Sequence, residues 1–164
     1  MQIFTFAIKS EKNIIKNLLC YRDKMKSKFE MLIIIVLLFG IDQISKYFFY
    51  TLAWGSDLPF LSPVFNTGIS RWIKIPMIVI IIFSLLCMGL IIALYRKNIF
   101  TKREFGLFVA GTLGNLFDRL FFSWVRDFIS LGNFPVFNVA DMLLSGALLL
   151  FVLREFFPNC FSKK

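Results

Sequence analysis

Two carboxylates lie on either side of one short connector in the last third of the chain. Asp127 belongs to the connector and Asp141 lies just inside the apolar run that follows, so thirteen residues separate them. If the flanking apolar segments pack as an antiparallel hairpin, the two carboxylates can meet. Paired carboxylates do not both ionise easily, so they share a proton and titrate as a unit. One can then act as base on a water while the other, protonated, polarises a carbonyl group, as in aspartic peptidases.

The rest of the composition removes the common alternatives. The chain contains no histidine, which excludes Ser–His and Cys–His nucleophile pairs and the usual zinc sites. Its three cysteines are far apart and form no C-x-x-C pair. We therefore expect neither a metal nor a cofactor. A Ser70–Lys74 pair is a further possibility for a lysine base, but Pro76 and the loop setting make it unconvincing.

These carboxylates must be positioned by membrane-spanning helices. The chain is 58% hydrophobic, with a mean hydropathy of +0.75, against about 45–50% apolar residues in an ordinary soluble domain. Four apolar runs have roughly the length that crosses a bilayer, at residues 29–50, 75–95, 104–122 and 137–157. The sequence predicts an all-α polytopic membrane protein of four transmembrane helices. Helix breakers in 51–74 predict a small β-containing segment between helices 1 and 2.

The basic residues set the orientation of these helices. The N-terminal segment, the 96–103 loop and the C-terminus are rich in Lys and Arg, which predicts that all three are cytoplasmic. Segments 51–74 and 123–136 are then outside. Because the positive charges flank the spans, the formal charge of +9 gives no reason to expect a nucleic-acid partner.

The acidic residues lie at the two ends of the predicted helices and not between them. Five of the ten are in outer loops or at outer helix ends, namely Asp42, Asp57, Asp118, Asp127 and Asp141. An ion or solute pathway would need polar groups through the middle of the bilayer. This one-sided placement favours chemistry at the outer surface. A small transporter with functional Asp residues and a non-enzymatic membrane assembly protein are the alternatives.

Other polar residues near this outer edge could support the pair. Asp42 and Lys46 are four residues apart and share one helical face, which predicts either an internal ion pair or a lysine that snorkels to the membrane surface. Asp118 and Arg119 are expected mainly to fix loop geometry by pairing with other groups. Three amides could hold a peptide backbone, orient a carboxylate, or simply form turns and helix caps: Asn66, Asn115 and Asn138.

The chain divides into three parts by composition. Residues 1–28 form a basic cytoplasmic extension, for which a loose and dispensable tail is favoured over a basic amphipathic helix on the membrane surface. Residues 29–157 form the four-helix domain, and 158–164 a cytoplasmic tail. Trp124, Phe128 and nearby phenylalanines are expected to form an interfacial aromatic belt.

Five motifs give the chain a family resemblance over about residues 29–157. They are Asp42-Gln-x-x-Lys46, Phe65-Asn66-x-Gly68, Gly114-Asn115-x-x-Asp118-Arg119, Val125-x-Asp127-Phe128-Ile129 and Phe137-Asn138-x-Ala140-Asp141. In this order they resemble the bacterial lipoprotein signal peptidases (signal peptidase II). The resemblance implies a membrane aspartic endopeptidase that cuts lipid-modified prolipoproteins just before the diacylglyceryl-cysteine.

The same resemblance implies roles for individual residues. The catalytic pair would be Asp127 and Asp141. Substrate-binding or supporting roles would fall to Asp42, Lys46, Asn66, Gly68, Asn115, Asp118, Arg119, Asn138 and Ala140. We expect a monomer in the bacterial cytoplasmic (inner) membrane, with the active site at the outer (periplasmic) face and membrane lipids as partners.

The chain departs from the family pattern in three places. Ile69-Ser70-Arg71 follows Gly68, where a small residue and then an aromatic one are usual; Ser123 replaces a usual glycine, and Arg126 replaces an apolar residue. Strand alternation predicts that Arg126 points away from Asp127, toward lipid headgroups. Its replacement by valine is therefore expected to keep or raise activity. An Arg126 turned inward would instead favour an ionised Asp127 and disturb proton sharing.

Overall fold

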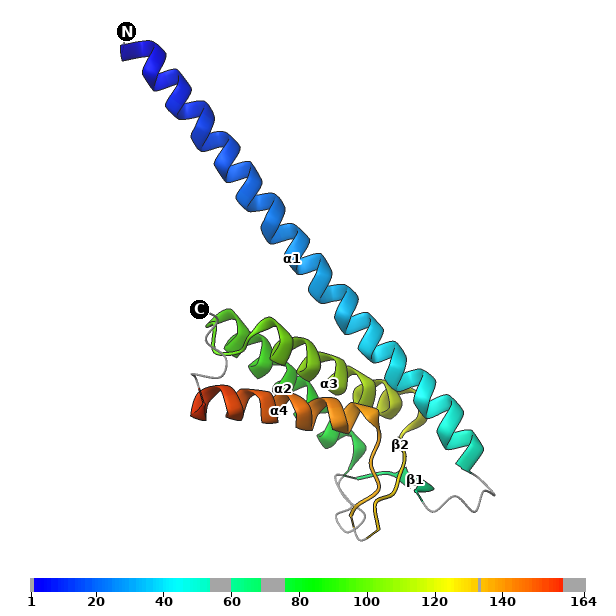
Figure 1. The fold of residues 1–164 in the computed structure, drawn as a ribbon. Coiled ribbons are helices and arrows are strands. Elements are labelled where there is room, and N and C mark those ends of the chain that lie inside the picture. Colours follow the sequence, from blue (N-terminus) through cyan, green and yellow to red (C-terminus); the bar gives the residue numbers. More distant parts are fainter. Residues whose placement is uncertain (1, 54–59, 69–75, 133, 158–164) are drawn as a thin grey trace. The chain divides into compact units, whose positions relative to one another are not determined.

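The computed structural model of this chain describes all residues except 1, 54–59, 69–75, 133 and 158–164, and gives no side-chain surroundings for 2–20, 23, 24, 52 and 53. Most of the described chain is helical (Figure 1), in helices α1 (Gln2–Ala53), α2 (Met77–Arg96), α3 (Lys102–Phe122) and α4 (Val139–Phe156). Two short strands, β1 (Leu61–Asn66) and β2 (Val125–Ile129), complete the fold. The predicted helical class with a small β segment is confirmed.

The chain separates into two compact units, residues 1–34 and residues 35–164. The first unit is helical from Gln2 onward, as the N-terminal part of α1. The favoured prediction of a loose tail over residues 1–28 is therefore wrong. No glycine or proline interrupts residues 2–39, so nothing in the sequence stops the helix from continuing past the apolar run.

In the part of the chain that the structure describes, three helices are long and apolar enough to cross a membrane by length and composition, at Met25–Thr51, Met77–Arg96 and Lys102–Phe122. Helix α4 has 18 residues and carries three charged ones, Asp141, Arg154 and Glu155. The observed bounds of α2, α3 and α4 lie within two residues of those predicted.

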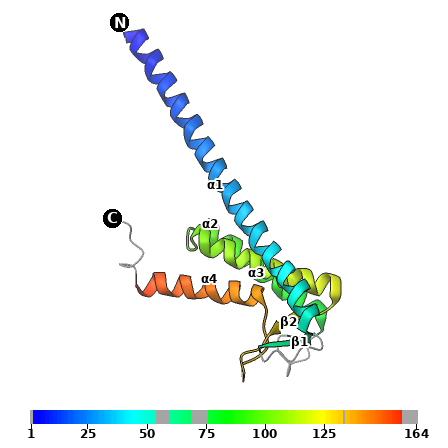
Figure 2. The ribbon, with the colours of Figure 1, turned by 45° about the vertical axis from the view of Figure 1, so that its right-hand side comes forward.

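Helix α3 packs against both α2 and α4, as Figure 2 also shows. It runs antiparallel to α4, because Asn115 near its end bonds to Asp141 while Glu104 at its start bonds to Arg154. Gly111 allows this close approach: a Cβ there would lie 2.7 Å from the carbonyl oxygen of Ala140. The antiparallel hairpin that would let the two carboxylates meet is therefore present in the structure.

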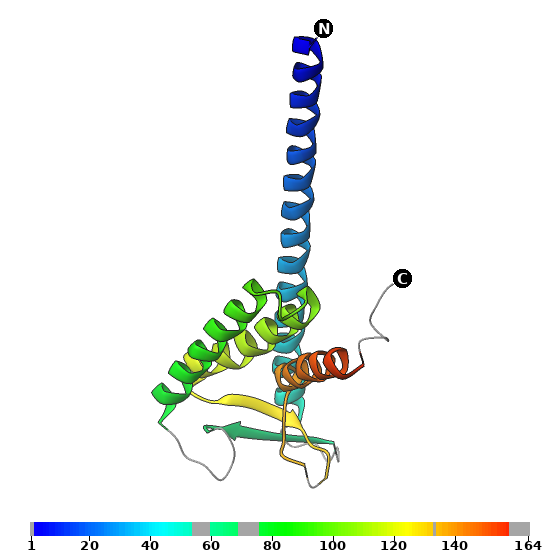
Figure 3. The same ribbon diagram turned by 90° about the vertical axis from the view of Figure 1, so that its left-hand side faces the viewer.

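The two strands pair antiparallel, with Val64 opposite Asp127 and Phe65 opposite Arg126. Figure 3 shows them beyond the end of the helices where α3 finishes and α4 begins. The register shifts between Leu61 and Val64, where Pro63 has no N–H to donate to the ladder. The strand predicted within 51–74 is confirmed, and it holds the segment that carries Asp127.

Phe128 does not belong to an exposed aromatic belt. Its side chain is 2% exposed, and it stacks on Phe49 of α1 with ring centroids 5.7 Å apart. Trp124 packs edge-on against Phe65 of β1, at 5.2 Å between centroids. Phe128 is therefore packed inside the protein, which corrects the prediction that it belongs to an interfacial aromatic belt.

Candidate active site

Asp141 is placed by the start of helix α4. The side chain of Asn138 accepts a hydrogen bond from the backbone N–H of Asp141 at 3.1 Å, and the Asp141 carboxylate accepts one from the N–H of Asn138 at 3.2 Å. This is a capping box, which satisfies two of the free N–H groups at a helix start. The predicted alternative for Asn138, helix capping, is therefore observed, and it holds Asp141 within the first turn.

Asp127 is placed by strand β2 and held by two amides. Its Oδ2 accepts a hydrogen bond from Nδ2 of Asn66 at 2.8 Å, and its Oδ1 accepts one from Nδ2 of Asn138 at 2.6 Å. Asn138 thus binds the carboxylate of Asp141 through its backbone N–H and the carboxylate of Asp127 through its side-chain amide. The two candidate carboxylates are brought together around one asparagine.

The surroundings of Asp127 favour its protonated form. The side chain is 2% exposed, and this burial is the main reason that its pKa rises from 3.8 to about 7. The nearby carboxylate of Asp141 raises the pKa of Asp127 further, whereas the bonds from Asn66 and Asn138 and the charge of Lys46 lower it. A carboxyl group with this pKa can hold a proton at neutral pH.

Asn115 of α3 connects the pair to helix α1. Its Nδ2 donates to Asp141 at 2.8 Å, while its Oδ1 accepts from Nδ2 of Asn138 at 3.1 Å and from Nζ of Lys46 at 3.2 Å. Because both bonds to Oδ1 come from donors, the amide group is oriented with its Nδ2 toward Asp141.

A fully buried ion pair lies behind Asn115. Lys46 and Asp42 are both 0% exposed, and Nζ lies 2.9 Å from Oδ2 of Asp42, as the spacing predicted. Asp42 also accepts the backbone N–H of Ala140 at 2.8 Å, so α1 is bonded directly to the first turn of α4. Gly114 makes room for this contact, since a Cβ there would lie 2.5 Å from Oδ2 of Asp42.

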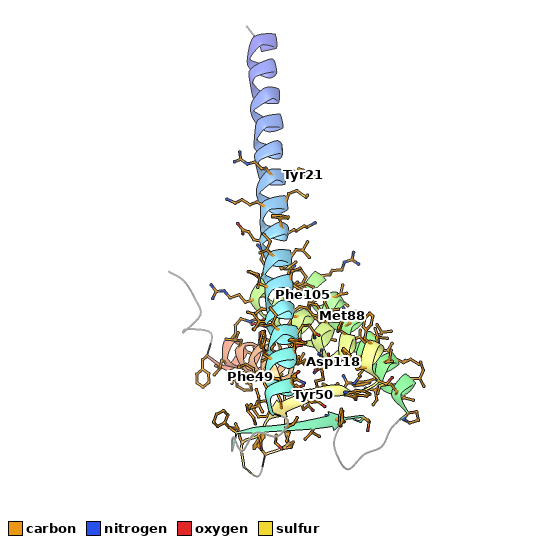
Figure 4. The ribbon with its side chains drawn as sticks, turned by 90° about the vertical axis from the view of Figure 1, so that its right-hand side faces the viewer. Tyr21, Phe49, Tyr50, Met88, Phe105 and Asp118 are labelled. Carbon is orange, nitrogen blue, oxygen red and sulfur yellow. The ribbon has the colours of Figure 1, made fainter. Side chains whose placement is uncertain are left out.

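Asp118 joins the same cluster, beside the C-terminal part of α1, which also carries Phe49 and Tyr50 (Figure 4). Its carboxylate lies 3.3 Å from Nζ of Lys46 and 2.7 Å from Nη2 of Arg126. The expected pairing of Asp118 with other groups is observed. The expectation that Arg126 points to lipid headgroups is wrong, because its guanidinium is turned onto Asp118.

Gly68 and Arg119 lie at the edges of this network. The N–H of Gly68 donates to Oδ1 of Asn66 at 3.2 Å, which orients that amide toward Asp127. Nη1 of Arg119 donates to the carbonyl oxygen of Asn115 at 3.4 Å. Among the described residues, the buried Nε of Arg119 finds no hydrogen-bond partner.

Asp141 lines two cavities. One, of about 500 Å³, runs between α2, α3 and α4, with Asn115, Arg119 and Asp141 among otherwise mainly apolar lining residues. The other, of about 460 Å³, lies against the start of α4 and is lined by Phe134, Pro135, Phe137, Asp141, Met142 and Ser145. An apolar chain entering either cavity would reach Asp141.

All eleven residues singled out from the sequence belong to one continuous set of hydrogen bonds and ion pairs. Sequence reasoning missed Gln43, which bonds to Arg126, and the carbonyl of Gly114, which accepts from Lys46. The sequence offered one signal for the contact between Arg126 and Asp118. Arg126 is a basic residue eight positions after Asp118, to which no partner had been assigned. Ser70, Lys74 and the Ile69–Arg71 departure lie outside the described residues.

This arrangement can be compared with known proteins. The family model described as "Signal peptidase (SPase) II" matches residues 34–157 of the chain. The chain belongs to the signal peptidase II family. It is therefore a membrane peptidase, and the transporter and assembly-protein alternatives fall away.

Individual relatives agree with this membership. The lipoprotein signal peptidase of Anaplasma marginale (strain Florida) is 36% identical over 149 residues, covering 80% of this chain and 86% of that protein. That of Thermodesulfovibrio yellowstonii is 34% identical over 135 residues, covering 74% and 90%. Together with the apolar helices, these matches indicate a bacterial membrane protein.

Solved structures show the same fold. A structure described as a bacterial membrane enzyme matches with a TM-score of 0.65 at 25% identity, over 82% of this chain and 92% of its own. A second structure of the same description matches with a TM-score of 0.64 at 26% identity, over 76% and 90%.

Proposed function

We propose that this signal peptidase II is an aspartic endopeptidase that cuts diacylglyceryl-modified prolipoproteins before the lipidated cysteine. The observation that carries the proposal is the double contact of Asn138, at 2.6 Å to Asp127 and 3.2 Å to Asp141. It places both carboxylates within hydrogen-bond reach of one residue, beside mainly apolar cavities that suit a lipid-bound chain. The relatives' name, lipoprotein signal peptidase, supports the substrate class.

The two carboxylates take different parts in the reaction. Asp127, whose pKa is near 7, holds the proton and donates a hydrogen bond to the scissile carbonyl oxygen. Asp141, which lines both cavities, acts as the base and takes a proton from a water. The resulting hydroxide oxygen attacks the carbonyl carbon and forms a tetrahedral intermediate. The C–N bond then breaks as Asp141 passes its proton to the leaving nitrogen. Neither step requires a metal or a cofactor.

The remaining residues of the site hold this pair in place. Asn66 and Asn138 keep Asp127 oriented, and Asn115 keeps Asp141 oriented by bonding it to the Lys46 ion pair. Holding reacting groups in the correct orientation accounts for a large part of the rate enhancement of many enzymes. Gly68 and Ala140 act through their backbone N–H groups, which bind Asn66 and Asp42.

The chain is inserted with four spans and both termini in the cytoplasm. Helix α4 is the fourth span, and its one basic residue, Arg154, pairs with Glu104 at the cytoplasmic start of α3. The site then faces the outer side of the bacterial cytoplasmic membrane, where a lipid-modified precursor would be presented. The monomeric state expected from the sequence is part of this proposal.

The deciding experiment is cleavage of a diacylated precursor peptide by the protein reconstituted in lipid, beside the same peptide without lipid. Asp127→Asn and Asp141→Asn should each reduce turnover below detection while the protein stays folded and inserted. The lipid-free peptide should be a poor substrate. Appreciable turnover by either Asn variant would refute the paired-carboxylate mechanism, and equal cleavage of both peptides would refute the substrate class.

A further inference from the structure

Arg126 has no part in the proposed chemistry, yet its side chain is tightly bound. The side chain is 14% exposed, and its guanidinium forms a fork on Asp118, with Nη2 2.7 Å from Oδ1 and Nε 3.3 Å from Oδ2. Nη2 also donates to Oε1 of Gln43 at 2.7 Å, and the group lies 4.4 Å from the ring centroid of Phe122. Bidentate bonding of this kind is both stronger and more directional than a single ion contact.

The backbone of Arg126 is bound to the same carboxylate. Its N–H donates to Oδ2 of Asp118 at 3.0 Å. One carboxylate on α3 therefore fixes both the main chain and the side chain of residue 126, while Gln43 of α1 fixes the guanidinium from another side. The next residue is Asp127, so the backbone directly before this aspartate is held in place by Asp118.

The contact also balances the buried charges. Asp42 and Asp118 are fully buried, and Lys46 and Arg126 supply the two positive charges that face them. Without Arg126, Lys46 would be the one cation among the described residues in ion-pair contact with these two buried carboxylates, and an unbalanced buried charge is costly. Lys46 is one of the two residues that orient Asn115, together with Asn138, and Asn115 holds Asp141. A shift of Lys46 toward Asp118 would therefore move Asn115 and, through it, the carboxylate of Asp141.

We propose that Arg126 is a positioning residue: it fixes Asp127 through the backbone and Asp141 through Asp118, Lys46 and Asn115. The proposal rests on the proposed function of the two aspartates. The sequence led to the expectation that Arg126→Val keeps or raises activity. The proposal reverses this expectation, because valine cannot form the guanidinium contacts with Asp118 and Gln43. A displacement of about 1 Å at reacting groups can lower a rate by about 100-fold.

The test compares Arg126→Leu and Arg126→Lys with a matched control, Arg154→Leu. Arg154 makes a similar contact elsewhere: Nε lies 2.9 Å from Oε1 of Glu104, and the guanidinium 5.5 Å from the ring centroid of Phe151. This pair joins the other ends of α3 and α4, away from both aspartates. For each variant, kcat and KM for the diacylated peptide and the thermal midpoint are measured in the same lipid.

Arg126→Leu should lower kcat by about tenfold or more, with KM within about twofold, as expected for displaced reacting groups. Arg126→Lys should fall in between, since lysine keeps the charge but cannot form the fork. Arg154→Leu should lower the thermal midpoint and leave kcat within about twofold. If Arg126→Leu does not fold, Arg126→Lys carries the test by the same comparison of kcat with KM.

Two results would overturn the proposal. One is a kcat within twofold of the parent for whichever Arg126 variants fold. The other is a loss of kcat in Arg154→Leu that matches that of Arg126→Leu, since the effect would then be general destabilisation. Turnover by Asp127→Asn would instead refute the proposed function, so the two failures are distinguishable.

Discussion

Asn138 and Asp141 cap each other: the Asn138 side chain accepts the N–H of Asp141 at 3.1 Å, and the Asp141 carboxylate accepts the N–H of Asn138 at 3.2 Å. Such reciprocal caps are common at helix starts. Here the remaining amide donor of Asn138 also reaches Asp127, at 2.6 Å. One residue therefore both starts helix α4 and joins the two carboxylates.

The two roles of Asn138 can be separated by substitution. Asn138→Ala removes both, whereas Asn138→Ser keeps a side-chain oxygen for the cap but has no amide to reach Asp127. We expect the Ser variant to be more stable than the Ala variant by about 1 kcal/mol. Both should lose most of their cleavage activity. Thermal unfolding and the cleavage assay check this, and near-parental activity in the Ser variant would show that only the cap matters.

The raised pKa of Asp127 should make stability depend on pH. The pKa is 3.8 for an unperturbed carboxyl and about 7 in the folded protein, with burial as the main cause. Between these values the folded state holds a proton that the unfolded state has released. The contribution of Asp127 to the free energy of unfolding therefore falls as pH rises from about 4 to about 7, by at most about 1.4 kcal/mol per pH unit.

The variant Asp127→Asn cannot titrate at this position and serves as the reference. As pH rises from 5 to 8, the thermal midpoint of Asp127→Asn should increase relative to that of the parent protein. Melting curves of the two proteins at several pH values measure this difference directly. A difference that stays constant across the range would contradict the raised pKa.

Cleavage should lose rate on the alkaline side for the same reason. The reaction needs the proton held by Asp127, and that proton is lost as pH rises through about 7. We expect kcat/KM, which reports the pKa of the free enzyme, to fall by up to about tenfold per pH unit above that point. A pH–rate profile in lipid tests this, provided that the protein remains folded throughout. A rate still rising at pH 9 would exclude Asp127 as the acid.

Ser123 should limit stability at the end of helix α3. Its φ is +66°, in the left-handed region that favours glycine, and its N–H donates to the carbonyl of Arg119 at 3.2 Å. Ser123→Gly should therefore raise the stability of the protein by about 0.5–1 kcal/mol. The control Ala93→Gly, at an exposed position inside α2, should lower it by about 1 kcal/mol. Thermal midpoints that move in the same direction would contradict this account.

Removal of residues 1–24 should leave cleavage unchanged. The segment lies within the first compact unit, and the candidate span Met25–Thr51 begins after it. Every residue of the candidate site lies beyond it as well. The measurement is cleavage in membranes at equal amounts of inserted protein. A large loss of activity would give this basic helix a role of its own.

Local spacing predicted much of the fold and part of the site. Bounds of three helices agree within two residues, because long apolar runs and helix breakers act locally. The Asp42–Lys46 pair follows from one helical turn, and the Asn138 cap from its position before α4. The N-terminal segment was predicted wrongly, since its high charge argues against a span but not against a helix.

The sequence by itself determined the membrane class, the two candidate aspartates and the family resemblance. Only the tertiary structure decided that Asn115 connects Lys46 to Asp141, that Arg126 turns onto Asp118, and that the pKa of Asp127 rises. The physical reason is that burial and charge pairing depend on which distant elements pack together. Lys46 and Asn115 are 69 residues apart, and no local pattern specifies a bond across that separation.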